Sequence, residues 1–175
     1  MRHLILSILL ILICLNCYPS NKSDSSSLTF LDISIPSALS EFEQALASNG
    51  FSKTVENNTG TCFTGLFLNH STNIALFSDN QIVYGIYLDM SVEENAIDFY
   101  LDLIKHFQKK YPDFNTKYPN IDAMTDEKNE IMTILGNGRF GVALVIDLGH
   151  SPTSVEIHYF LPNAENINKL TIDDL

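Results

Sequence analysis

The side chains that could do chemistry in this chain are its histidines, one internal cysteine and its many carboxylates. His158 shares a predicted strand face with Glu156, and Asp147 stands three residues before His150 in a predicted turn. Either pair could serve acid–base catalysis, but such spacings are common by chance, and a metal site needs three or four converging ligands. We therefore expect solvated histidines and no metal site. A hydrolase that uses His150 or His158 is kept as an alternative.

Two further patterns suggest chemistry that their surroundings do not support. Cys62 lies in a strand-like segment without a neighbouring basic residue to lower its pKa, so we expect a small buried apolar side chain rather than a nucleophile. The run Gly136-Asn137-Gly138-Arg139-Phe140-Gly141 matches the glycine pattern of dinucleotide-binding loops. That site requires a helix after the glycines, whereas here an alternating strand follows, which predicts a hairpin turn. We expect no catalytic residue and no cofactor.

The composition sets the class of protein and argues against nucleic-acid binding. The chain has 175 residues, of which 45% are hydrophobic and 18% charged, enough for one packed domain. Ten basic residues against 21 acidic ones give a net charge of −11, the opposite of what phosphate binding needs. Three cysteines are too few for a disulfide scaffold. Such a charge favours a basic protein partner through electrostatic steering.

The first residues indicate an export signal. Arg2 and His3 precede an apolar run from Leu4 to Leu15, which is too short to span a bilayer because spanning takes about 20 residues. A basic start followed by a short apolar run is typical of a secretory signal peptide. We predict a signal peptide over residues 1–16 and a flexible, serine-rich tether over residues 17–27.

The end of this leader, Leu15-Asn16-Cys17, resembles the lipobox of bacterial lipoproteins, although Asn16 stands where that family prefers a smaller residue. The resemblance implies that Cys17 becomes the first residue of the mature protein and carries acyl chains. Each buried methylene contributes about 0.8 kcal/mol, so several chains hold a protein on a membrane. We expect a lipid anchor in the bacterial cell envelope, in the periplasm or on the outer surface. Ordinary cleavage and secretion are the alternative.

We predict a single domain over residues 28–162, and its first elements are a strand and a helix. Alternation predicts a strand at 28–35, Ser37 is the candidate N-cap, and Asn49-Gly50 is the left-handed stop of the helix. The chain resembles the opening of small uncharacterised exported bacterial domains at Ile35-Pro36, Phe42, Leu46 and Gly50-Phe51. That resemblance implies an α+β fold type and no activity.

Strands, a second helix and further strands follow. Strand-like runs lie at 51–56, 61–68, 73–78 and 81–90, with a tight turn at Asp79-Asn80. Ser91 and Glu94 form a predicted capping box that starts the second helix, and Pro112 ends it. The apolar stripe predicted for this helix comprises Ile97, Tyr100, Leu101, Ile104, Phe107 and Tyr111. After a polar connection at 113–129, strands are predicted at 130–135, 139–147 and 154–161.

The short turns predict antiparallel pairing, and two amphipathic helices would cover one face of the sheet. The expected fold is α+β, a two-layer sandwich with an antiparallel sheet of about six to eight strands. No internal repeat is strong enough to name, and residues 163–175 form a polar, acidic tail.

For function, we expect a non-catalytic binding protein rather than an enzyme, with the membrane and a protein as its partners. A narrower version is an immunity protein or inhibitor that neutralises a basic toxin or hydrolase. A small-ligand carrier, with its pocket between sheet and helices, is the further alternative.

Overall fold

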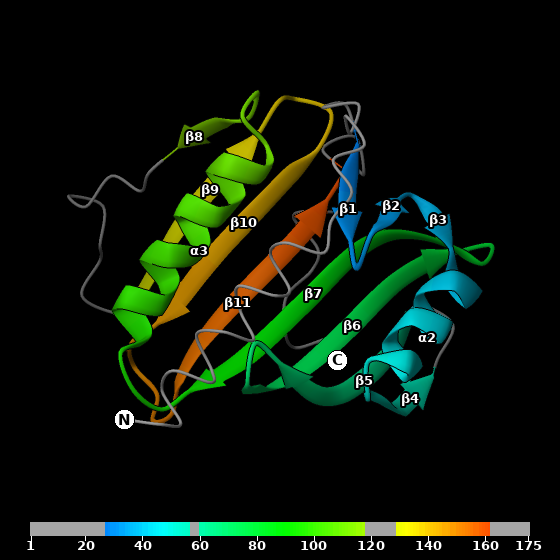
Figure 1. Ribbon diagram of the computed structural model, residues 1–175, viewed down its shortest axis with the longest axis horizontal. Helices are drawn as coiled ribbons and strands as arrows, with labels where there is room; N and C mark the ends of the chain where they lie inside the picture. Colours follow the sequence, from blue (N-terminus) through cyan, green and yellow to red (C-terminus); the bar gives the residue numbers. More distant parts are fainter. Residues whose placement is uncertain (1–26, 57–59, 118–128, 162–175) are drawn as a thin grey trace, which may run out of the picture.

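The computed structural model describes residues 27–56, 60–117 and 129–161, which form a large antiparallel sheet, a separate small hairpin and two helices (Figure 1). The large sheet has nine strands and the hairpin two. The elements are β1 Leu28–Phe30, β2 Ile33–Ile35, β3 Ser37–Ala38, α2 Leu39–Ser48, β4 Ser52–Glu56, β5 Gly60–Phe67, β6 His70–Asp79, β7 Ile82–Val92, α3 Ala96–Lys110, β8 Asn115–Lys117, β9 Glu130–Gly136, β10 Gly141–Asp147 and β11 Thr153–Phe160.

The large sheet consists of two meanders that meet at their last strands. The order across it is β4-β5-β6-β7-β11-β10-β9-β8, and β3 pairs with β7 outside this path. Because α2 precedes the first four strands of this path and α3 precedes the other four, the arrangement of one helix followed by four antiparallel strands occurs twice. The sequence shows no matching repeat, so this duplication is visible only in the structure.

The two meanders are joined by the antiparallel ladder between β7 and β11, which we call the seam. It runs from Val92 opposite Thr153 to Ile86 opposite Tyr159. Since successive side chains of a strand point to opposite faces, Ile86 and Tyr159 face the same side of the sheet, and both are buried. The central strands of the sheet thus come from both halves of the chain.

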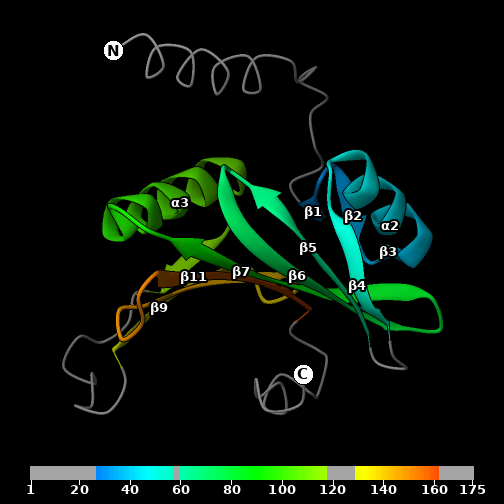
Figure 2. The same ribbon diagram turned by 90° about the horizontal axis from the view of Figure 1, so that it is seen from below.

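Both helices and the β1–β2 hairpin lie on the same side of the sheet (Figure 2). α2 contributes the buried Phe42 and Leu46 to the core, and α3 contributes Phe107. On the facing strands the core residues are fully buried, as Leu88 and Leu144 illustrate. The predicted α+β class with antiparallel pairing is therefore confirmed. The sheet is larger than expected because β3 and β8 add short strands in segments predicted as a helix start and a polar connection.

The predicted start of the second helix is wrong. β7 continues through Ser91, which pairs with Ser154 of β11, so Ser91 and Glu94 do not form a capping box. The helix begins at Ala96 after Asn95, whose φ of 57° turns the chain, and no side chain caps it there. Pairing with a neighbouring strand thus outweighs a local capping signal.

The first helix shows the same effect at its start and the expected geometry at its end. Ser37 is not the N-cap, because β3 pairs with β7 and moves the cap to Ala38. The stop is confirmed: Gly50 has a φ of 82°, and the Phe51 N–H donates to the Leu46 carbonyl at 3.0 Å. The predicted strand at 28–35 is a hairpin instead, because positive φ at Leu31 and Asp32 reverses the chain.

Two strand details also differ from the expectation. The tight turn lies at Asn80-Gln81, which have positive φ, rather than at Asp79-Asn80. Alternation at Ile82, Tyr84, Ile86, Leu88 and Met90 predicts one apolar face, but an irregular register between β6 and β7 brings Val83 into the core and leaves Ile82 exposed. The strands predicted near 130–135, 139–147 and 154–161 are confirmed as β9, β10 and β11 to within two residues.

The apolar stripe of α3 is only partly buried. Tyr100, Ile104, Phe107 and Tyr111 are buried as predicted, and Leu103 joins them. Ile97 and Leu101 are instead 56% and 46% exposed. Because they stand four residues apart, they lie on one face of the helix, at the solvent-exposed edge of the stripe.

Candidate functional site

The side of the sheet opposite the helices carries a polar cluster at the seam. His158 Nε2 and Glu156 Oε2 are 2.8 Å apart, which confirms that these two residues share a strand face. Tyr87 lies directly opposite His158 in the ladder, and the two rings meet edge-on with centroids 4.8 Å apart. The backbone register alone positions these three side chains.

Each carboxylate of this cluster is hydrogen-bonded within it. Ser154 Oγ donates to Asp89 Oδ1 at 2.7 Å, and Tyr87 is hydrogen-bonded to Glu156. Burial raises the pKa of Tyr87, and the charges of Glu156 and Asp89 raise it further. A phenol held neutral in this way does not act as a nucleophile near neutral pH, and its hydrogen bond occupies Glu156.

The second predicted pair lies in the turn between β10 and β11. His150 Nδ1 and Asp147 Oδ2 are 2.6 Å apart, and Asp147 Oδ1 also accepts the Gly149 N–H at 2.7 Å. The His150 side chain is 74% exposed. Asp147 therefore stabilises a surface turn, and the solvated histidine expected here is confirmed.

Two hollows lie at the two ends of the strands. The first, of about 410 Å³, is lined by Asn115, Lys117, Ile134, Gly136, Asn137, Gly138, Phe140, Gly141 and Phe160. The second, of about 490 Å³, is lined by Glu93, Asn95, Ala96, Ile97, Asp98, Leu148 and Thr153. Neither hollow is lined by a histidine, so neither histidine–carboxylate pair is set in one of them.

The remaining candidates are Cys62 and the glycine-rich run. Cys62 is a free thiol of intermediate burial rather than the buried side chain expected, and this partial burial raises its pKa, which lowers its reactivity. Gly136 is the last residue of β9, and Gly138 lies in the turn to β10, where Asn137 Oδ1 accepts the N–H of Arg139. A strand follows this turn and pairs with β9, which confirms the predicted hairpin. Among the described residues, no three histidine, cysteine, aspartate or glutamate side chains converge on a metal position.

The predicted lipid-attachment residue, Cys17, lies outside the described residues, as do residues 1–16 of the leader and the tail from 163 onward. Across the described ranges, no helix is long and apolar enough to cross a bilayer.

Comparisons with known proteins identify no relative. No protein-family model, no curated protein and no solved structure matches this chain. The assignment of a function therefore depends on the residues and their geometry alone.

The partly exposed apolar surface along α3 was not predicted from the sequence. Ile97 and Leu101 were predicted as part of the buried stripe, yet both are about half exposed, and Leu148 near the end of β10 is also 41% exposed. The width of the apolar stripe on α3 could have indicated this exposure. A helix whose apolar residues include both Ile97 with Leu101 and Tyr100 with Leu103 has an apolar sector too wide to be buried against one sheet.

Proposed function

We propose that this chain is a non-catalytic interaction protein of the bacterial cell envelope, exported by its leader and held on a membrane through acyl chains on Cys17. The basic start, the short apolar run and the lipobox-like Leu15-Asn16-Cys17 support export and anchoring. The serine-rich segment that follows would let the domain stand away from the membrane surface.

The proposal of a non-catalytic role depends on a contrast: the polar cluster is hydrogen-bonded within itself, whereas the apolar surface is exposed to solvent. The polar groups at the seam are hydrogen-bonded to one another, and His158 with Glu156 borders neither described hollow. Ile97 and Leu148, by contrast, are exposed and border the second hollow. Exposed apolar side chains rimmed by polar residues are typical of protein-binding surfaces.

We also propose that the domain is a two-layer sandwich, with the helices and the β1–β2 hairpin as one layer and the sheet as the other. The position of both helices on one side of the sheet supports this (Figure 2). In the described part of the chain, no helix lies on the opposite side.

The anchor is tested by mass spectrometry of the protein produced in a bacterial host, with Cys17→Ala and, as the matched control, Cys62→Ala. We expect the wild type and Cys62→Ala to start at residue 17, carry acyl mass and fractionate with membranes. Cys17→Ala should lose the acyl mass and leave the membrane fraction. Recovery of cytosolic protein that still begins at Met1 would refute the proposal.

The narrower proposal is that the partner is a basic toxin or hydrolase that this chain neutralises. The net charge of −11 supports it, because opposite charges accelerate association. A basic enzyme encoded beside this chain should lose activity when the purified proteins are mixed, and the inhibition should weaken as salt is added.

A hydrolase remains a second candidate, supported by the two histidine–carboxylate pairs. If it is right, a hydrolytic activity of the purified protein should be lost in His158→Gln or His150→Gln. Equal activity of both variants and the wild type would eliminate it.

A further inference from the structure

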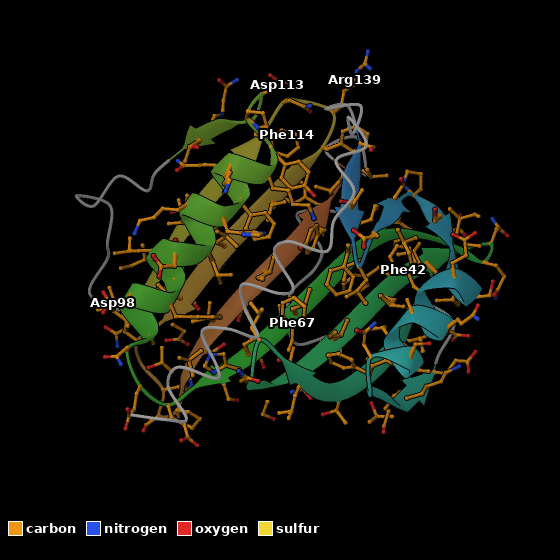
Figure 3. All side chains as sticks on the ribbon, viewed as in Figure 1. Phe42, Phe67, Asp98, Asp113, Phe114 and Arg139 are labelled. Carbon is orange, nitrogen blue, oxygen red and sulfur yellow. The ribbon has the colours of Figure 1, made fainter. Side chains whose placement is uncertain are left out.

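The charged side chains of the domain are unevenly distributed along α3. Lys109 and Lys110 stand in its last turn, and Arg139 lies beyond this end of the helix (Figure 3). Gln108 Nε2 donates to Thr116 Oγ1 at 3.1 Å, which ties the strand that carries Lys117 to the same end. We call this the basic end of the domain.

The chain also enters the domain at the basic end. Lys110 Nζ donates to the Thr29 carbonyl at 3.1 Å, and the Tyr111 hydroxyl donates to the same carbonyl at 3.0 Å. Thr29 belongs to β1, the first strand after the predicted tether. A membrane anchor at Cys17 would therefore attach to the domain at its basic end.

The opposite end of α3 is acidic. Glu93, Glu94 and Asp98 are exposed around the start of the helix, and Figure 3 shows Asp98 far from Asp113 and Arg139. Glu93 and Asp98 border the hollow of about 490 Å³ together with Leu148. We call this region, made of Glu93, Glu94, Ile97, Asp98 and Leu148, the acidic end.

The acidic end combines negative charge with exposed apolar area. Ile97 and Leu148 line its hollow, and Leu101 continues the apolar surface one helical turn further along α3. Acids that surround an apolar patch keep it soluble and select against anionic surfaces, including a bilayer of anionic lipids. They attract a partner that carries the opposite charge.

We propose that the acidic end binds a basic protein segment, which places one apolar side chain against Ile97 and Leu148 and sets lysine or arginine side chains against Glu93, Glu94 and Asp98. The charge complementarity decides the occupant, because the acids would repel anionic lipids. The inference deepens the proposed function: it rests on this chain being a binding protein, and it does not require the lipid anchor. With an anchor, the site would lie at the end of the domain opposite to the attached tether.

The test measures binding of a fluorescein-labelled peptide of lysine and alanine with one central phenylalanine to the full chain as the cell processes it. Fluorescence anisotropy at low ionic strength should show binding that weakens about tenfold in moderate salt. Replacing the phenylalanine of the peptide by alanine, or Ile97 by serine, should weaken binding about fivefold each. Asp98→Lys should weaken it about tenfold.

Two matched variants distinguish binding at this site from non-specific electrostatic or hydrophobic binding. Glu41→Lys changes the net charge as Asp98→Lys does, but on α2, and Ile82→Ser removes an exposed isoleucine at the start of β7, whereas Glu93 follows the end of that strand. Both should bind the peptide within about twofold of the wild type, because they lie away from the acidic end. If Glu41→Lys weakens binding as much as Asp98→Lys, or if Ile97→Ser has no effect, the site is wrong.

Two other occupants are outcomes that would overturn the proposal. Binding to vesicles of anionic lipid that disappears in Ile97→Ser would assign the surface to a membrane. Concentration-dependent self-association in sedimentation velocity that disappears in the same variant would assign it to a second copy of the chain. Membrane retention through Cys17 without any peptide binding would refute the site and leave the proposed anchoring intact.

Discussion

Asp89 and Glu156 stand directly opposite each other at the midpoint of the ladder between β7 and β11. Two carboxylates in this position repel each other, and like charges across a strand pair are destabilising. Here each is hydrogen-bonded, Asp89 to Ser154 and Glu156 to His158. The seam between the two meanders is thus held together by apolar packing on one face, while its other face carries a repelling carboxylate pair whose members are each hydrogen-bonded to a neighbour.

Removing one of these charges should stabilise the fold slightly. In Asp89→Asn the remaining amide oxygen still accepts the Ser154 hydroxyl, while the repulsion with Glu156 disappears. We expect the free energy of unfolding in urea at pH 7 to rise by about 0.2–1 kcal/mol. Glu41→Gln, an exposed charge on α2, should change it by less than about 0.5 kcal/mol. A loss above about 1 kcal/mol in Asp89→Asn would show that the charge itself stabilises the seam.

A buried hydrogen bond should couple α3 to the sheet. The Tyr100 hydroxyl lies 2.8 Å from Thr133 Oγ1 and 3.2 Å from the Leu144 carbonyl oxygen, and its single hydrogen is shared between these two acceptors. Tyr100→Phe leaves both acceptors without this donor and should cost about 1–3 kcal/mol of unfolding free energy. Thr133→Val should cost about 1 kcal/mol alone, and the double variant should be less destabilised than the sum by about 0.5–3 kcal/mol. Strict additivity in urea unfolding would show that the two groups do not interact.

Alkaline pH should destabilise the protein through its buried tyrosines. Burial raises the pKa of Tyr159, and burial also dominates the raised pKa values of Tyr87 and Tyr100. A raised folded-state pKa stabilises below the ordinary value near 10, and the contribution is lost as the pH rises above it, because the unfolded chain ionises first. We expect fewer of the seven tyrosines to titrate between about pH 9 and 11 in the folded protein than in urea, by absorbance at 295 nm.

Tyr159→Phe is the matching variant for this titration. It should leave the number of tyrosines that titrate in the folded state unchanged and make unfolding less sensitive to pH above about 10. If a titrating tyrosine is lost from the folded-state curve of this variant, Tyr159 is more accessible than its burial indicates.

The aromatic ring of Phe160 lies against Gly141. A Cβ at this position would come within 2.3 Å of the Phe160 ring, so Gly141→Ala should cost about 1–3 kcal/mol of unfolding free energy. In a Phe160→Ala background the same substitution should cost clearly less. Gly138 provides the control: its φ of 84° strains alanine by about 1 kcal/mol, with no atom in contact, so Phe160→Ala should not relieve that cost. Equal costs of Gly141→Ala in both backgrounds would refute the ring contact.

The parts of the fold that local chemistry determines were predictable from the sequence. Alternation identified β10 and β11 almost to the residue, and the Asn49-Gly50 stop is confirmed because its left-handed geometry depends only on neighbouring residues. Capping was not predictable at Ser91, since a ladder partner 63 positions further along the chain, Ser154, holds Ser91 in a strand. The duplicated arrangement was equally hidden, because it lies in strand order rather than in sequence similarity.

In the candidate site too, contacts between residues close in the sequence were predictable, whereas contacts between distant strands were not. The pairing of His158 with Glu156 follows from strand alternation, and that of Asp147 with His150 from the closeness of the two residues in one turn. The addition of Tyr87 and Asp89 depends on which strand lies beside β11, which the sequence does not state. The exposure of Ile97 was missed because the stripe was treated as one buried face, whereas only part of it fits against the sheet.

The position of β7 and β11 in the middle of the sheet makes the two halves of the chain depend on each other. A fragment that ended before α3 would bare one whole side of β7, with its row of backbone donors and acceptors open to any other strand. Such a fragment would be prone to self-association. The exposed side of β7 is covered only after β11 has been synthesised and has paired with it. The protein is therefore one cooperative body built from two similar parts, and cutting it between them would yield aggregates rather than smaller domains.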